Sequence, residues 1–151
     1  MQKITALALC LLSLIISSCD FGSESKKQKT PEELRLDLKI QEESNPKQYL
    51  TLDSVYMNQN KIREAGIFTS AKYDGYIITG IVKNSATIAK FKDLKITVQM
   101  YSKTETLIDE QTHIFYEFYE PNSENKFAIK VNPPPAMNSY QVSIVEALPT
   151  R

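Results

Sequence analysis

A period of two in the apolar residues is the feature that most constrains the fold of this chain. The clearest case is the segment 91–101, where every second residue from 94 to 100 is apolar: Leu94, Ile96, Val98 and Met100. Successive side chains of a β-strand point to opposite faces, so this alternation predicts a strand with one apolar face. Further strands are predicted over 49–57, 67–73, 76–84, 107–118, 127–131 and 140–144.

About seven short strands in roughly 100 residues predict a mainly β fold, an antiparallel β-sandwich. No helical pattern separates the strands, which argues against a parallel sheet. Asp74-Gly75 is a strong hairpin signal, so we expect a tight turn there. We assign the sandwich domain to residues 46–151.

The segment 30–45 precedes the strands and favours one short N-terminal helix. Thr30-Pro31-Glu32-Glu33 has a capping residue, a proline at the first helical position and an acid three residues after the cap. Leu34, Leu36, Leu38 and Ile40 fit both strand alternation and helical i,i+4 pairs. We favour a helix over 31–43, which Ser44-Asn45-Pro46 ends because proline disfavours helical geometry in the residue before it.

The first 19 residues have a different character. Lys3 precedes an apolar run over 4–16, and Ser17 and Ser18 stand directly before Cys19. This order resembles the signal peptide and lipobox of bacterial lipoproteins. The resemblance implies removal of residues 1–18, a lipid on the Cys19 sulfur and acylation of the new amino terminus. The mature protein is then held on the extracytoplasmic side of a membrane.

The length of the apolar run argues against a transmembrane anchor. Its 13 residues are short for a bilayer-spanning helix, which needs about 20. Residues 19–29 form the lipidated cysteine and a polar stalk, which as a flexible coil spans roughly 16–19 Å. Asp20 resembles an inner-membrane retention signal of enteric bacteria. Other bacterial phyla sort their lipoproteins differently, so the inner membrane, the outer membrane and the cell surface all stay open.

The composition of the mature chain argues against a nucleic-acid partner and against a disulfide. Cleavage after Ser18 leaves 17 Lys and Arg against 18 Asp and Glu, which lacks the basic balance of a nucleic-acid-binding protein. Cys19 is then the only cysteine, and its sulfur carries lipid, so no intramolecular disulfide is expected. Stability has to come from an apolar core.

Several positions between residues 76 and 147 occur in a familiar order. They are Gly80-x-Val82-x-Asn84, Phe91 and Leu94 before Val98-Gln99-Met100-Tyr101-Ser102, then Pro121, Phe127-x-Ile129 and Tyr140-x-Val142. In this order the segment resembles the FxLYD-type immunoglobulin-like domains of bacterial membrane-attached proteins. The name-giving motif matches at Tyr101, and Ser102 replaces its aspartate. The preceding segment resembles an extension of small Bacteroidota lipoproteins of unknown function. The resemblance implies an immunoglobulin-like fold and brings no catalytic or metal-binding residues.

The residues that most enzymes use are scarce. His113 is the only histidine, and it lies out of phase with the expected inward set of Thr112, Ile114, Tyr116 and Phe118, so we expect it at the surface. Zinc sites draw on several His and Cys side chains. No G-x-S-x-G elbow or glycine-rich phosphate loop is present. We therefore expect no enzyme activity, no metal, no cofactor and no small-molecule substrate.

One stretch is a candidate binding surface. Residues 115–120 read Phe-Tyr-Glu-Phe-Tyr-Glu, with aromatic side chains on both faces of the expected strand. We expect Phe115 to point outward, and Phe115 and Tyr119 are the candidate partner-binding residues. Burial of the second face by the N-terminal helix explains the same pattern, so both interpretations stay open.

These observations predict a membrane-anchored lipoprotein of the cell envelope that acts as a non-enzymatic binding or structural module. An alternative is a subunit of a larger envelope complex, which docks on a protein partner through its helix or its aromatic strand.

Overall fold

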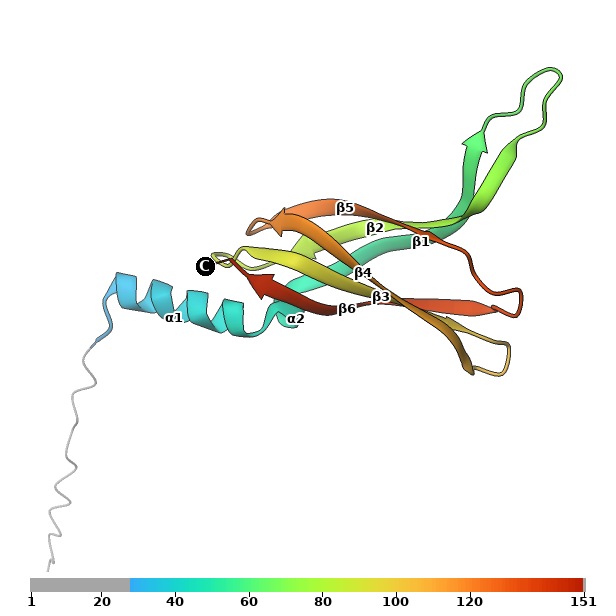
Figure 1. Cartoon of the computed structure of the whole chain (residues 1–151). Coiled ribbons are helices and arrows are strands. Elements are labelled where there is room, and N and C mark those ends of the chain that lie inside the picture. Colours follow the sequence, from blue (N-terminus) through green and yellow to red (C-terminus); the bar gives the residue numbers. More distant parts are fainter. Residues whose placement is uncertain (1–27, 151) are drawn as a thin grey trace, which may run out of the picture.

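The computed structural model describes residues 28–150, which form two helices followed by six strands (Figure 1). The helices are α1 (Pro31–Ser44) and α2 (Pro46–Tyr49). The strands are β1 (Leu50–Arg63), β2 (Lys72–Asn84), β3 (Phe91–Tyr101), β4 (Leu107–Tyr119), β5 (Ser123–Val131) and β6 (Ser139–Pro149).

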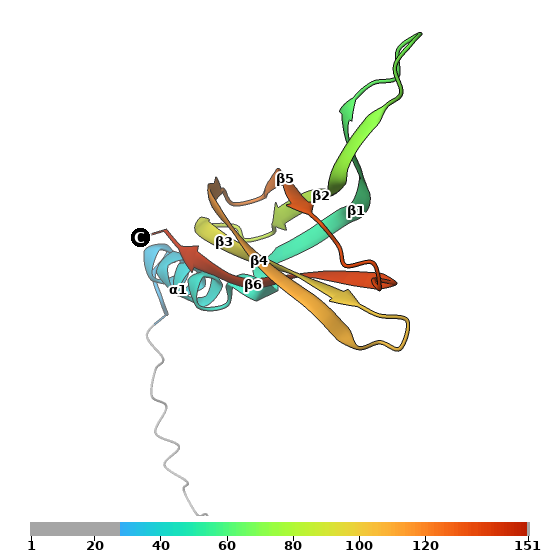
Figure 2. The ribbon, with the colours of Figure 1, turned by 45° about the vertical axis from the view of Figure 1, so that its right-hand side comes forward.

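The strands form two antiparallel sheets of three strands, in the orders β1-β2-β5 and β4-β3-β6. The sheets lie one over the other (Figures 1 and 2), and their facing side chains make the core. The predicted mainly β, sandwich-like fold is therefore confirmed. Residues 28–150 contain six strands, not the expected seven.

The missing strand belongs to a long hairpin arm. β1 continues to Arg63 and β2 starts at Lys72, so the segment expected as a strand over 67–73 is mostly the turn between them. This turn is closed by a bridge between Gly66 and Thr69. The arm leaves the sandwich at an angle and ends far from it (Figures 1 and 2).

The expected turn at Asp74-Gly75 is a β-bulge inside β2. Gln59 pairs with Tyr76 and Lys61 pairs with Tyr73, so Asp74 and Gly75 together face one residue of β1. Gly75 has a φ of 69°, the left-handed geometry that glycine adopts at such a bulge. A bulge increases the local twist and bends the strand, which accounts for the angle of the arm.

The core is centred on β3, which lies in the middle of its sheet. Five inward side chains of β3 are 0% exposed: Phe91, Leu94, Ile96, Val98 and Met100. In the other sheet, Phe127 on β5 pairs with Gly80 on β2, and its ring occupies the space where a Cβ on Gly80 would come within 2.7 Å of Phe127 Cε1. Gly80 is thus the close backbone approach that a glycine inside a strand indicates.

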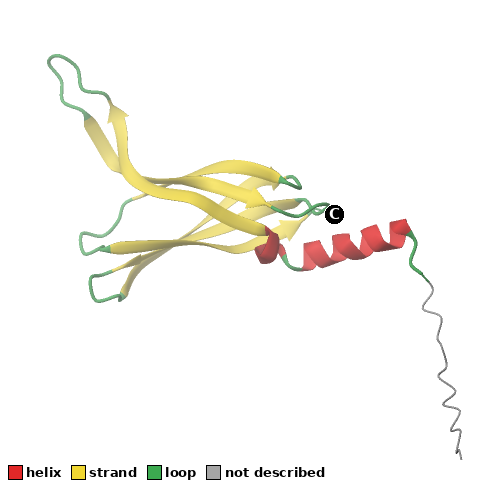
Figure 3. Cartoon of the chain, turned by 180° about the vertical axis from the view of Figure 1, so that it is seen from behind, coloured by secondary structure: helices red, strands yellow, loops and turns green. Residues whose placement is uncertain are grey.

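The N-terminal helix is confirmed, with its predicted start. The Thr30 hydroxyl accepts a hydrogen bond from the Glu33 N–H at 3.2 Å, and the Glu33 carboxylate accepts one from the Thr30 N–H at 2.7 Å. However, α1 extends away from the sandwich (Figure 3). It does not cover the aromatic stretch 115–120. The interpretation that the N-terminal helix buries the second face of that strand is therefore wrong. In the described part of the chain, neither helix has the length and apolarity to cross a bilayer.

Candidate functional site

The predicted lipidation site at Cys19 lies outside the described residues, as do the signal peptide over 1–18 and most of the stalk over 19–29. The described chain starts just before α1. The last turn of α1 contacts the sandwich at what we call the α1 junction: Glu42, Asn84 and the loop 85–90.

A buried carboxylate fastens α1 at this junction. Glu42, in the last turn of α1, is 1% exposed. One of its oxygens accepts hydrogen bonds from the N–H and the hydroxyl of Thr87, both at 2.8 Å. The other accepts from the N–H groups of Ile88 at 2.9 Å and Ala89 at 2.7 Å. Three consecutive backbone N–H groups thus form a nest around one anion.

The electrostatics of this nest favour the ionised acid. Burial raises the pKa of Glu42, because it removes water from the charged form, but the hydrogen bonds from Thr87, Ala89 and Ile88 outweigh it. The pKa therefore lies below the usual glutamate value. Among residues 28–150, no Lys or Arg forms a salt bridge with Glu42, so N–H and O–H dipoles alone compensate the charge.

Asn84 holds the same loop from the other side. It is 2% exposed, and its Oδ1 accepts a hydrogen bond from the Ala86 N–H at 3.0 Å. This is the side-chain turn that its place at the end of a strand indicates. Its Nδ2 lies 3.0–3.1 Å from the carbonyl oxygens of Ala89, Tyr119 and Glu120. The loop that binds Glu42 is therefore tied to the end of β4 as well.

The structure places both candidate partner-binding residues inside the sandwich. Tyr119 is 1% exposed, and burial, with a smaller contribution from Glu117, raises the pKa of its hydroxyl. Phe115 packs against the core, with its ring 5.9 Å from that of Phe127 in an edge-to-face arrangement. The expectation that Phe115 points outward is wrong, and a partner on the surface would not reach Tyr119.

The pairing with β3 sets the inward face of β4. Leu94, which is buried, pairs with Phe115, so the odd-numbered residues of β4 face the core here. Tyr119, four residues further along β4, pairs with Phe91 and is buried as well. The expected inward set faces out instead: Ile114, Tyr116 and Phe118 are 43%, 80% and 55% exposed.

His113 also faces the opposite way from the prediction. It pairs in register with the buried Ile96 and is itself half-buried. Its Nε2 atom is buried without a hydrogen-bond partner in the described part of the molecule. The expected surface histidine is therefore part of the inner face of β4.

A hollow of about 510 Å³ lies beside the α1 junction, where α2 meets β6. Its lining includes Pro46, Lys47, Val145 and Glu146. Within residues 28–150, no three His, Cys, Asp or Glu side chains gather as a group that could hold a metal ion.

Sequence reasoning missed the two most exposed large apolar side chains in the described part of the chain. Ile67 and Phe68, at the tip of the hairpin arm, are 94% and 96% exposed. The signal that could have found them was their adjacency: two consecutive apolar residues beside Gly66 break the period of two and fit a loop better than a strand.

No protein-family model, curated protein or solved structure matches the chain. A function has to be inferred from the residues of the chain itself.

Proposed function

We propose that this protein is a lipoprotein of the bacterial cell envelope, held at a membrane by the lipid on Cys19, where it acts as a non-enzymatic binding or structural module. The observation that carries the proposal is the order of Lys3, the apolar run over 4–16 and Ser17-Ser18 directly before Cys19. Two or three acyl chains at one cysteine give stable attachment, whereas a single chain gives only marginal binding.

The α1 junction supports this role. The chain between the anchor and the domain passes through α1, and Glu42 fixes the end of α1 to the loop 85–90 with four hydrogen bonds. This connection gives α1 a defined direction relative to the sandwich.

The strand connectivity supports an immunoglobulin-like sandwich, which we propose as the fold type. In that fold strands A, B and E share one sheet, and strands C′, C and F share the other. The orders β1-β2-β5 and β4-β3-β6 follow this pattern when β1 is matched to A and β6 to F. Strand G has no counterpart among residues 28–150.

The non-enzymatic part of the proposal rests on the positions of the reactive side chains. The imidazole Nε2 of His113, the only histidine, is buried. In the proposed mature protein the sulfur of Cys19 is bonded to lipid. Neither group then offers a nucleophile or a general base to a substrate in solution.

The test is the chemical state of Cys19 in the native membrane. Mass spectrometry of the amino-terminal peptide should find a chain that starts at Cys19 and carries diacylglycerol and an N-acyl group. Cys19→Ser should move the protein to the soluble fraction or leave the uncleaved precursor. An unacylated chain with an intact sequence before Cys19 would end the proposal.

A second candidate function is a subunit of a larger envelope complex. The observation that favours it is on α1, where Leu34, Leu36, Leu38 and Ile40 are 38–58% exposed. Protein solubilised in mild detergent should then elute at the size of an assembly. Elution as a monomer argues for the first function.

A further inference from the structure

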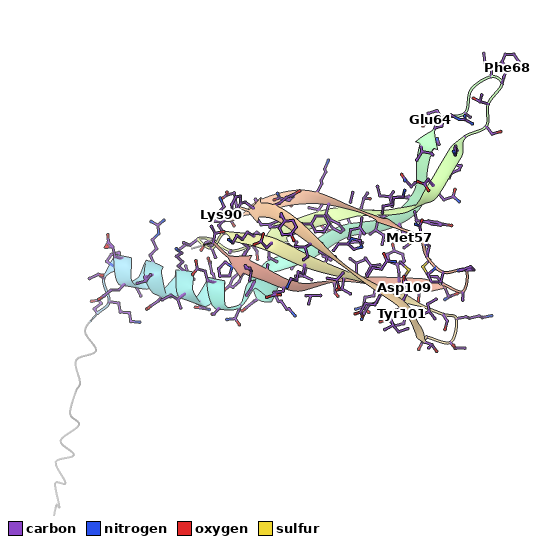
Figure 4. The ribbon with its side chains drawn as sticks, viewed as in Figure 1. Met57, Glu64, Phe68, Lys90, Tyr101 and Asp109 are labelled. Atoms are coloured by element: carbon purple, nitrogen blue, oxygen red, sulfur yellow. The ribbon has the colours of Figure 1, made fainter. Side chains whose placement is uncertain are left out.

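The tip of the hairpin arm combines two features that point to a ligand. Its apolar residues, Ile67 and Phe68, project from the end of the arm, on the opposite side of the molecule from α1 (Figures 1 and 4). Behind them, Arg63 and Lys72 face each other across the base of the tip as a cross-strand pair. We call residues 63–72 the arm tip.

Arg63 and Lys72 form a like-charged pair, and Lys72 is also attracted by Asp74. Like charges directly opposite on neighbouring strands repel each other and destabilise the pairing. Neither Arg63 nor Lys72 forms a salt bridge within residues 28–150, whereas the nearby Lys61 is paired with Glu64 at 2.8 Å. Both side chains are exposed. An external anion would remove the repulsion.

The rest of the arm tip is uncharged beyond Glu64, and part of its backbone is hydrogen-bonded. Residues 65–71 are seven consecutive uncharged residues. The Gly66 N–H donates to the Thr69 carbonyl at 2.8 Å, and the Thr69 N–H donates back to Gly66 at 3.3 Å. Arg63 donates to the Ser70 carbonyl at 3.1 Å. These bonds satisfy backbone groups that would otherwise resist transfer to an apolar medium.

We propose that the arm tip inserts Ile67 and Phe68 into an anionic bilayer that faces the end of the domain opposite α1, with Arg63 and Lys72 at its phosphates. A bilayer offers an apolar interior directly beneath a layer of negative charge, which matches the order of residues along the arm. An apolar protein groove would accept the two side chains but would leave the cation pair without a partner. The position relative to the anchor rests on the proposed function; the contact itself does not.

The size of the contact fits reversible binding. Two large side chains bury little apolar area, so the interaction depends on the attraction between basic residues and anionic lipid. Removal of both charges should therefore weaken binding to anionic vesicles by about ten- to thirtyfold. Binding should also decrease as the salt concentration rises.

Phe68→Trp supplies a direct reporter, because the chain has no tryptophan. Mature protein carrying this substitution is placed in donor vesicles of zwitterionic lipid. Acceptor vesicles rich in phosphatidylglycerol, with brominated acyl chains, are then added. We expect a blue shift of the tryptophan emission and quenching by the acceptor lipid. Tyr116→Trp, at an 80% exposed position on β4, should show neither.

Two double substitutions test the charges. In the protein that carries Phe68→Trp, the added substitutions Arg63→Gln and Lys72→Gln should weaken binding to the acceptor vesicles, measured by tryptophan quenching, about ten- to thirtyfold. The matched control, Lys47→Gln with Lys126→Gln, removes the same charge from exposed sites outside the arm and should leave it unchanged.

Three results would overturn the inference. The first is an unchanged tryptophan emission of Phe68→Trp when anionic acceptors are added. The second is quenching that occurs only when the brominated lipid is in the donor vesicles. The third is a blue shift of the emission that depends on protein concentration in the absence of acceptors. The last would mean that a second copy covers the tip. If the protein fails to enter donor vesicles, the anchor proposal fails, and adding the acceptors directly to the soluble protein still tests the arm tip.

Discussion

Glu42 is the residue on which the position of α1 depends. Its carboxylate replaces water with four hydrogen-bond donors, three of them backbone N–H groups from a single loop. Each donor is matched to an acceptor that only an ionised acid supplies in full. A neutral side chain of the same shape therefore changes the contact without changing its size.

The substitution Glu42→Gln tests this dependence. The amide keeps one acceptor oxygen but directs an NH₂ group at N–H donors, so we expect a loss of about 2 kcal/mol in the free energy of unfolding, the usual scale for hydrogen bonds to a charged group. Urea denaturation followed by circular dichroism measures it. Glu32→Gln, an exposed position on the same helix, is the control and should change stability by less than about 0.5 kcal/mol. Equal effects at both positions would contradict the role of the nest.

The same carboxylate predicts a pH dependence. The pKa of Glu42 is lower in the folded protein than in the unfolded chain, where a glutamate titrates at about 4.3. Its stabilisation is therefore complete above that value and is lost as the pH falls through the lower folded value. Unfolding free energies measured from neutral pH down to acid should decrease less steeply in Glu42→Gln than in the natural protein. Parallel curves for the two proteins would show that Glu42 is not responsible.

Among the elements, β4 has the strongest consequence for a binding surface. Its aromatic residues divide between the core and the solvent, and the pairing of β4 with the buried residues of β3 decides which residues face inward. Phe118 is exposed, and Lys90 makes a cation–π contact with it: the Lys90 Nζ lies 4.2 Å from the centroid of the Phe118 ring. Tyr116 is the most exposed aromatic residue of the strand.

Alanine substitutions separate the two faces. Phe115→Ala should destabilise the domain by about 2–4 kcal/mol, because it removes a ring that packs on Phe127 and leaves a cavity. Tyr116→Ala should change stability by less than about 0.5 kcal/mol, because its side chain is mostly in water. Thermal unfolding of both variants gives the comparison. Similar losses at both positions would mean that β4 does not have this orientation.

Local signals explain what could be predicted from the sequence. The start of α1 and both ends of β3 match the expectation, because a capping box and a strict alternation are decided by neighbouring residues. The inward face of β4 could not be predicted in this way. It depends on which residues of β4 pair with the buried residues of β3, and the sequence of β4 alone does not reveal that pairing.

The turn of the arm was missed for a related reason. Asp74-Gly75 signals a backbone with positive φ, which both a hairpin turn and a bulge require. Only the length of β1 beyond Met57 distinguishes the two, and that length is set by pairing with β2. Of the candidate site, the proposed lipidation of Cys19 rests on a linear pattern, which the sequence shows without the structure. The burial of Phe115 and Tyr119 is a property of the packed sheets.

At the scale of the whole molecule, the sandwich and the hairpin arm are separate in their contribution to stability. The core lies between the two sheets, and the arm tip contributes no residue to it. Replacement of residues 62–72 by Asn-Gly joins the cross-strand neighbours Lys61 and Tyr73 through a two-residue turn.

We expect this shortened protein to unfold within about 2 °C of the natural one, since exposed substitutions away from the core have small effects. Differential scanning calorimetry is the measurement. A large drop in the melting temperature would show that the arm helps to hold the sandwich together. A deletion within the β3–β4 turn, residues 102–106, is the comparison. It removes the internal hydrogen bonds of that turn and should lower the melting temperature more than the shortened arm does.

The α1 junction also determines how a protein tethered at its amino end responds to mechanical load. A pull on the proposed anchor reaches the Glu42 nest before it reaches any strand, because the nest is at the end of α1 and α1 precedes the strands. Release of those bonds would let α1 swing away and lengthen the reach of the domain while both sheets stay intact. Force spectroscopy should record this as a small, reversible extension at low force, ahead of the main rupture, and the extension should disappear in Glu42→Gln.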